Sequence, residues 1–136
     1  MTEEERIFRG ELFASEEPEL VEKKRRAHRL SQKYNETFED DAEVREAILR
    51  ELLGELGEGV CMLGPVRFHY GCHTRVGNHC FMNFNFTVQD DALVTIGDHC
   101  NFGPNVTIVT PMHPMLPDER RGMVCDDGVE RFLCYA

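Results

Sequence analysis

His113 is the residue of this sequence best suited to proton transfer. It stands in the segment 110–114 (TPMHP), directly after a repeated pattern described below. Imidazole is mostly neutral yet basic at pH 7, so a histidine can remove a proton from a reacting group. Pro111 and Pro114 fix backbone angles beside it and restrict how the loop can fold. The segment favours His113 as a general base, although a surface-loop histidine without a role fits the same residues.

Asn83 and Asp91 are further candidates for binding. A side-chain amide can donate to one reactant and accept from another, so Asn83 could orient two reactants. Asparagine is also common at tight corners with left-handed backbone angles, a structural use that suits Asn85 and Asn105. The carboxylate of Asp91 could accept hydrogen bonds from ligand hydroxyls, or it could lie solvated at a corner. Residue types alone leave these alternatives open.

The six cysteines do not follow the spacing of a structural zinc site, because the sequence contains no C-x-x-C pair. We expect reduced, buried thiols, with Cys80 and Cys100 at inward positions that suit a small apolar side chain. Disulfides or structural zinc are the weaker alternative. The cysteines are Cys61, Cys72, Cys80, Cys100, Cys125 and Cys134.

The elements that position these residues are indicated by an internal repeat. Segments 76–80 (VGNHC) and 96–100 (IGDHC) are near copies, twenty residues apart. Apolar residues recur every six positions, a period that fits neither a helix nor an alternating strand. It predicts a parallel β-helix with triangular coils of about eighteen residues. We place the two extra residues of each coil near 90–95. The first apolar register is Val76, Met82, Val88, Ile96, Phe102 and Ile108, and the second is Cys80, Phe86, Ala92, Cys100 and Val106.

The content of charged residues falls and the six-residue repeat begins near Gly59. Residues 1–58 hold seventeen of the 25 acidic residues and ten of the 15 basic residues. We therefore assign 1–58 to an N-terminal α-helical cap and 59–136 to the β-helix. Such a cap would cover the open strand edges of the first coil, which otherwise invite association with other chains.

Two amphipathic helices are predicted within the cap. The first has Ser15 as its N-cap and runs from Pro18 to about Tyr34, and the second runs from about Asp41 to Leu53. The basic run from Lys23 to Arg29 is interpreted as a solvated helix face. The predicted apolar faces are Leu20, Ala27, Leu30 and Tyr34 in the first helix, and Val44, Ile48, Leu52 and Leu53 in the second.

Composition limits the class of function. A hydrophobic content of 41% and a mean hydropathy of -0.41 are ordinary for a globular protein. The net charge of -10 disfavours nucleic acid and anionic membrane as partners. No apolar run is long enough for a membrane span, and the acidic N-terminus argues against a secretory signal. We expect a cytoplasmic protein.

Taken together, the chain resembles the maltose/galactoside (sugar) O-acetyltransferases of the hexapeptide-repeat superfamily. The matching motifs cover nearly the whole chain in order. They are 9–13 (RGELF), 18–20 (PEL), 68–71 (FHYG), 83–85 (NFN), 90–91 (DD), 96–98 (IGD), 103–106 (GPNV) and 110–114 (TPMHP). The resemblance implies a mainly β protein with a left-handed parallel β-helix, assembled as a homotrimer with active sites between subunits. It also implies acetyl transfer from acetyl-CoA to a sugar hydroxyl, without a metal.

The resemblance implies roles for individual residues. His113 corresponds to the general base that deprotonates the sugar hydroxyl, and Asn83 lies near both the acetyl donor and the acceptor. Asp91 corresponds to a sugar contact. His69 and Phe81 correspond to sugar-pocket positions where some members carry a smaller hydroxyl residue and a tyrosine.

The N-terminal part of the site departs from the family pattern, because segment 14–17 (ASEE) stands where relatives place an acid. Ser15 is the candidate contact there. The chain also resembles a C-terminally shortened member or a fragment, since relatives continue past Ala136 into further coils that supply most of the coenzyme A groove.

Two other interpretations stay open. A trimeric scaffold or remnant without catalysis is favoured by the shortened C-terminus. A metal enzyme similar to the β-helix carbonic anhydrases has enough histidines, namely His69, His73, His79, His99 and His113. However, His79 and His99 fall at equivalent outward corners of the two repeats, which disfavours a shared metal.

Overall fold

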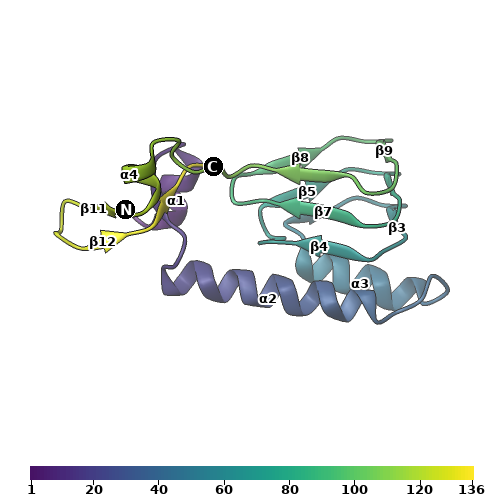
Figure 1. The fold of residues 1–136 in the computed structure, drawn as a ribbon. Helices are drawn as coiled ribbons and strands as arrows, with labels where there is room; N and C mark the ends of the chain where they lie inside the picture. The colour runs from purple at the N-terminus through teal and green to yellow at the C-terminus, as the bar shows by residue number, and fades with distance from the viewer.

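The computed structural model describes all residues 1–136. Short parallel strands from Glu55 to Val109 form a three-sided coil. Two helices lie along one end of the coil, and both chain termini gather in an arm at one side (Figure 1). The prediction of a parallel β-helix with an N-terminal two-helix cap is confirmed.

Three parallel sheets of three strands each form the sides of the coil. Equivalent strands of successive coils pair at an offset of twenty residues, for example Cys61 with Phe81 and Phe81 with Asn101. The first sheet contains β2 (Glu55–Leu56), β5 (Thr74–Val76) and β8 (Val94–Ile96). The second contains β3 (Cys61–Met62), β6 (Phe81–Met82) and β9 (Asn101–Phe102), and the third contains β4 (Val66–Phe68), β7 (Phe86–Gln89) and β10 (Thr107–Val109).

The corners explain how six-residue steps become twenty-residue coils. Four corner residues have positive φ, between 56° and 61°, and they are His79, Asn85, His99 and Asn105. The structural use predicted for Asn85 and Asn105 is thereby confirmed. The corner between β7 and β8 is longer, spanning 90–93, as the repeat predicted. This long corner carries Asp91, a candidate site residue.

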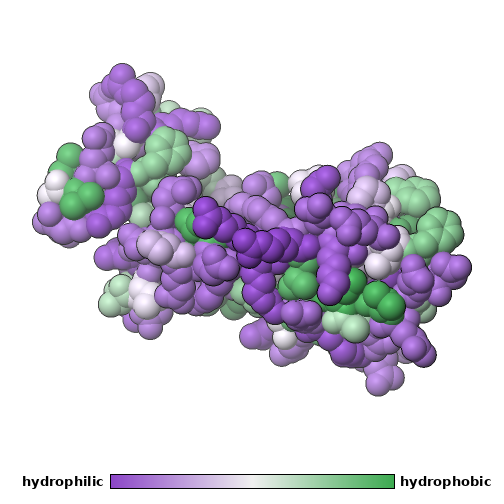
Figure 2. Space-filling view, turned by 90° about the horizontal axis from the view of Figure 1, so that it is seen from below, coloured by the Kyte–Doolittle hydropathy of each residue, from purple (hydrophilic) through white to green (hydrophobic).

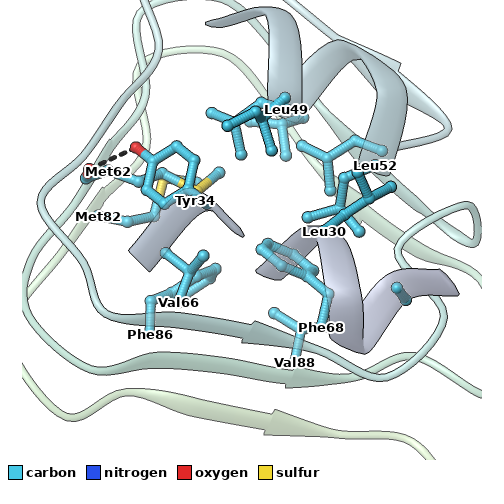
Figure 3. Close-up of a cluster of buried hydrophobic side chains, with 14 of the residues drawn as sticks. Leu30, Tyr34, Leu49, Leu52, Met62, Val66, Phe68, Met82, Phe86 and Val88 are labelled. Carbon is cyan, nitrogen blue, oxygen red and sulfur yellow. Dashed lines mark hydrogen bonds between the residues drawn. The ribbon is translucent and has the colours of Figure 1, made fainter. Parts of the chain in front are cut away.

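The core lies inside the coil and continues under the helices (Figure 3). Met82, Phe86 and Val88 are at most 1% exposed. The last coil is only partly covered, and its inward residues Cys100, Phe102, Val106 and Ile108 are partly buried against the same core. Both apolar registers of the repeat therefore point inward except at Ala92, which lies in the long corner and packs against the cluster that includes Phe13 and Tyr70.

Helices α2 (Pro18–Asn35) and α3 (Ala42–Leu52) close one end of the coil. Each begins and ends within about a residue of its predicted bounds. All four residues of the predicted α2 face are buried, and the hydroxyl of Tyr34 donates to the carbonyl of Met62 at 2.6 Å (Figure 3). On α3 the prediction for Val44 was wrong, because it is 51% exposed and Leu49 is buried instead.

The N-cap prediction for Ser15 was also wrong. Glu17 occupies the N-cap position, and no side chain caps the helix there. Pro18 at the first helical position has no N–H to satisfy, which reduces the need for a side-chain cap. Ser15 is instead held by a side chain of α2, as described below.

The arm joins both ends of the chain, and the sequence did not predict it. Antiparallel pairing links Phe13 to Cys134 and Ala14 to Leu133, and a further bridge joins Met112 to Tyr135. The N-terminal elements of the arm are α1 (Glu3–Phe8) and β1 (Phe13–Ala14). The C-terminal elements are α4 (Pro117–Arg120), β11 (Met123–Val124), β12 (Glu130–Arg131) and β13 (Leu133–Cys134).

The surface over α2 and α3 is mostly hydrophilic, with smaller hydrophobic patches (Figure 2). No helix in the protein combines the length and apolar character needed to cross a bilayer. All six cysteines are free thiols, and Cys80 and Cys134 are buried. The expectation of burial was wrong for Cys61 and Cys72, which lie at exposed positions.

Candidate active site

The corner after β7 holds two buried carboxyl groups, Asp90 and Asp91, that differ in their hydrogen bonding. Asp90 is fully buried, and its oxygens accept hydrogen bonds from the Tyr70 N–H and the Thr74 hydroxyl, both at 2.7 Å. Asp91 is only 3% exposed, and its Oδ2 atom is buried without a hydrogen-bond partner. Burial raises the pKa of the Asp91 carboxyl. Asp90 therefore builds the corner, whereas Asp91 keeps an acceptor oxygen free; a solvated role for Asp91 was wrong.

Lys24 lies beside this corner and links it to the N-terminal arm. Its Nζ donates to the carbonyl of Ser15 at 2.7 Å. Its positive charge partly offsets the effect of burial on the pKa of Asp91. The interpretation of 23–29 as a solvated face was thus wrong for Lys24, which is half-buried, and also for Lys23, which binds Glu4 at 2.8 Å.

His69 lies at the end of β4, next to Tyr70, and pairs with a second imidazole. Its Nδ1 and the Nε2 of His28 lie 3.2 Å apart, so one ring donates to the other. Burial lowers the pKa of His69 to about 4, with smaller contributions from His28 and Lys24. His69 is therefore neutral at pH 7 and can act both as a donor and as an acceptor.

Cys134 completes this group from the C-terminal arm. Burial raises the pKa of its thiol to about 11, and the nearby charge of Asp91 acts in the same direction. Ser15 acts on the pKa of this thiol in the opposite direction. The thiol stays protonated at pH 7 and is a poor nucleophile. We call the residues around this corner the Asp91 cluster, namely Ser15, Lys24, His69, Asp91 and Cys134.

Lys24 connects three residues that the sequence proposed, because its Nζ binds the carbonyl of Ser15 and its charge acts on His69 and Asp91. Sequence reasoning missed Lys24 and Cys134. A lysine near the start of an amphipathic helix could have signalled contact with the arm, because it lies only nine residues from Ser15. Nothing local marks Cys134, whose pairing partner Phe13 is distant in the sequence.

His113 lies on the chain that leaves the coil at the same corner. The Thr110 hydroxyl accepts from the Ala92 N–H at 3.0 Å, which holds the start of this segment against the corner. Met112 and Tyr135 exchange backbone hydrogen bonds of 2.9 and 2.8 Å, next to Cys134. The His113 ring contacts that of Phe132, with centroids 5.7 Å apart, and its Nδ1 is buried without a partner. The loop of His113 is thereby tied to the strand that borders Asp91.

Asn83 and Phe81 lie at a different corner. Phe81 belongs to β6, and Asn83 follows it before the chain turns into β7. The four residues of β7 alone span about 13 Å at 3.3 Å per residue, and they separate Asn83 from Asp91. In Figure 1 the strands of this second sheet lie on the side of the coil away from the arm. A single chain does not bring these residues together with the Asp91 cluster.

The side chain of Asn83 shows which of its groups is free. Its Oδ1 accepts from the N–H of Phe84 at 2.8 Å, so the amide nitrogen is left to donate outward. Asn83 has no positive φ, unlike Asn85 two residues later. The alternative that Asn83 merely fills a left-handed corner is therefore wrong.

The remaining histidines serve other contacts. His79 and His99 are exposed and stack on each other, with centroids 5.3 Å apart and planes inclined by 21°. Their equivalent corner positions, predicted from the repeat, are confirmed. His73 is buried, and it contacts Glu4 through Nε2 and the backbone of the 90–91 turn through Nδ1. The histidines of the coil thus occupy distinct places.

Comparison with known proteins decides the family. The maltose acetyltransferase hexapeptide capping motif matches residues 6–57. Nodulation protein L of Rhizobium meliloti is 38% identical over 88% of this chain and 66% of its own length. A maltose O-acetyltransferase from Clostridium difficile superposes with a TM-score of 0.86 at 32% identity, over 97% of this chain and 68% of its own. The chain belongs to the maltose and galactoside O-acetyltransferase family.

A second solved structure, galactoside acetyltransferase in complex with coenzyme A, gives a TM-score of 0.87 at 33% identity. The likeness covers 100% of this chain and 64% of that one. The chain therefore spans about two thirds of the length of these family members. Its coil is the left-handed β-helix of the family, as the sequence predicted.

Proposed function

We propose that this protein transfers an acetyl group from acetyl-CoA to a hydroxyl of a sugar such as maltose, glucose or a galactoside. The observation that carries the proposal is the Asp91 cluster with the loop of His113 tied beside it. Membership in the maltose and galactoside O-acetyltransferase family supports the same reaction class.

His113 acts as the general base. It removes the proton of the sugar hydroxyl while the oxygen attacks the carbonyl carbon of the acetyl thioester. An O–C bond forms, the C–S bond breaks, and the proton passes on to the departing thiolate. The two prolines beside His113 hold it in a stiff loop, which keeps the imidazole near one position.

Asn83 serves the acetyl donor. Acetyl-CoA supplies the activated acetyl group, and the free amide nitrogen of Asn83 fits its thioester oxygen as a hydrogen-bond donor. Negative charge develops on that oxygen during attack, so a donor aimed at it lowers the barrier. Phe81, half-buried on the same outward face, borders this corner.

The Asp91 cluster binds the acceptor. The unpartnered Oδ2 of Asp91 would accept a hydrogen bond from a sugar hydroxyl, which removes the cost of a buried, unsatisfied oxygen. Neutral His69 offers a donor or acceptor, and Lys24 supplies a positive charge nearby. Ser15 lies at the edge, where its hydroxyl can add a further contact.

Two copies of the chain are needed to complete this site. His113 and Asp91 belong to one end of the sheet formed by β4, β7 and β10, and Asn83 belongs to the other end. A second copy that places its Asn83 corner against the Asp91 corner of the first would unite them. Repeating that contact head to tail about a threefold axis closes a ring. We infer a homotrimer with three such sites.

The test is release of the coenzyme A thiol, measured with acetyl-CoA and a panel of maltose, glucose and galactosides. The proposal expects sugar-dependent release and an acetylated product seen by mass spectrometry. A folded oligomer that releases no thiol with any sugar contradicts it and supports the trimeric scaffold instead. The cytoplasmic location stays a prediction from the sequence.

A further inference from the structure

His73 is a buried histidine whose two ring nitrogens both face acceptors. Only 3% of the residue is exposed. Its Nδ1 lies 2.9 Å from the carbonyl oxygen of Asp90 and 2.8 Å from that of Asp91. Its Nε2 lies 2.8 Å from Oε1 of Glu4. Carbonyl and carboxylate oxygens have no proton to give, so both nitrogens donate and the ring is an imidazolium.

The charge of this imidazolium is balanced from the N-terminal arm. Oε1 of Glu4 accepts a hydrogen bond from His73. The Nζ of Lys23 lies 2.8 Å from each of the two carboxylate oxygens of Glu4. Burial lowers the pKa of His73, but the neighbouring groups of Cys72, Glu4 and the Asp90 backbone outweigh this effect and raise the pKa to about 9. A buried charge is tolerated where it is paired and hydrogen-bonded in this way.

Two aromatic rings fix the plane of the imidazolium. Tyr70 stacks on it with centroids 4.6 Å apart and planes inclined by 13°. Phe8 of α1 meets it edge-on, with centroids 5.0 Å apart and an inclination of 71°. The ring is therefore held by two aromatic neighbours and at both nitrogens, so it has little freedom to rotate.

His73 contacts the turn that carries Asp91, the residue proposed to bind the acceptor sugar. Both backbone carbonyls of 90–91 bind its Nδ1, and the Asp90 carboxylate is occupied by Tyr70 and Thr74. Oδ2 of Asp91 is the atom of this turn that remains buried and unpartnered. The backbone of this turn is therefore held at both carbonyls, while Oδ2 of Asp91 is left without a partner.

We propose that His73 is a positioning residue for acceptor binding, which locks the 90–91 backbone so that the Asp91 carboxylate is aimed at a sugar hydroxyl before the sugar arrives. The proposal rests on the proposed function, because it assigns His73 to the acceptor side of that site. Side chains that bind a substrate are commonly held in place by neighbouring residues that do not touch the substrate themselves. His73 shapes the affinity for the acceptor and leaves the acetyl donor side untouched.

The test compares His73→Asn with His79→Asn. An asparagine amide in place of the His73 ring is too short to bridge Glu4 and both carbonyls, whereas His79 is an exposed corner residue whose positive φ asparagine tolerates. We expect His73→Asn to raise the KM for the sugar about tenfold, with the KM for acetyl-CoA and kcat nearly unchanged. His79→Asn should change none of the three. A purely structural role would instead lower kcat or the amount of active enzyme with both KM values intact, and that result overturns the proposal.

Sugar binding separates this proposal from the proposed function. Wild-type protein that binds a sugar but transfers no acetyl contradicts the function, and the dissociation constant then becomes the measured quantity. A tenfold weaker dissociation constant in His73→Asn supports the positioning role, and an equal one refutes it. No sugar binding by the wild-type protein overturns both. Glu4→Gln, which keeps the shape but removes the negative charge, should give a smaller increase of the same kind.

Discussion

The side chain of Asn35 forms two hydrogen bonds with the backbone of Val66. Its Nδ2 donates to the Val66 carbonyl at 2.9 Å, and its Oδ1 accepts from the Val66 N–H at 2.7 Å. Val66 belongs to β4, the edge strand of its sheet on the side of α2. The last residue of α2 thus takes the place of a neighbouring strand at the edge of the first coil.

Asn35→Ala should destabilise the fold, because it leaves the N–H and carbonyl of Val66 without partners in a half-buried place. We expect a loss of about 2 kcal/mol in the free energy of unfolding, measured by urea denaturation. Gln32→Ala, an exposed substitution on the same helix, is the matched control and should cost little. Equal stability of the two variants would show that α2 does not seal this edge.

The stabilising effect of His73 should depend on pH. Its pKa rises from 6.5 to about 9 on folding, so its contribution is complete below pH 6.5 and is lost as the pH rises through 9. The shift corresponds to about 3 kcal/mol at 1.36 kcal/mol per pKa unit. The difference in unfolding free energy between wild type and His73→Asn should therefore shrink between pH 6.5 and 9.5.

The titratable groups that face His73 must be controlled in that experiment. They are Glu4, Lys23, Cys72, Tyr70 and the acids of the 90–91 turn. Both proteins are best compared in a Cys72→Ser background, since the exposed thiol lies beside the imidazole. A difference that stays constant across this pH range contradicts a charged His73.

Asp91→Asn should trade stability against sugar affinity. Burial raises the pKa of Asp91, so the ionised carboxylate destabilises the fold at neutral pH. This destabilisation disappears as the pH falls and the carboxyl becomes protonated. The neutral amide removes this destabilisation, so we expect Asp91→Asn to be more stable than the wild type at pH 7, and by a smaller margin at pH 4. The KM for the sugar should rise about tenfold through loss of a charge-assisted hydrogen bond. Asp126→Asn, on the exposed arm, should change neither quantity.

Mixed assemblies should reveal whether the site spans two chains. Asn83→Ala and His113→Ala chains are each expected to be nearly inactive. When they are unfolded and refolded together in equal amounts, about a quarter of the sites should unite an intact Asn83 with an intact His113 from the neighbour. Activity of the mixture near that of the separate variants would place both residues in one chain.

The coil and its cap could be predicted because their signals are local and periodic. The six-residue step predicted that Met82, Val88 and Phe102 point inward, since each side of the coil repeats the same geometry. Pro18 and the spacing of Leu20, Ala27 and Tyr34 located α2 for the same reason. The tandem copies also identified the corner histidines His79 and His99 as equivalent.

The arm and Cys134 of the Asp91 cluster could not be predicted because their contacts are distant in sequence. Glu4 and His73 meet across 69 residues, and β1 pairs with β13 near the opposite end of the chain. Two-residue strands carry no periodicity from which such pairings could be deduced. Lys24 looked solvated because helical spacing places it off the apolar face, yet its ammonium reaches back to Ser15.

The most direct test of the account is acetyl transfer by His113→Ala beside His99→Asn, with each protein's oligomeric state checked by light scattering. We predict that His113→Ala loses about 10²- to 10⁴-fold in kcat, the contribution of a general base, while retaining its assembly. His99→Asn should keep wild-type activity. Sugar acetylation that survives in His113→Ala at the wild-type rate would contradict the assignment of the base and the site built around it.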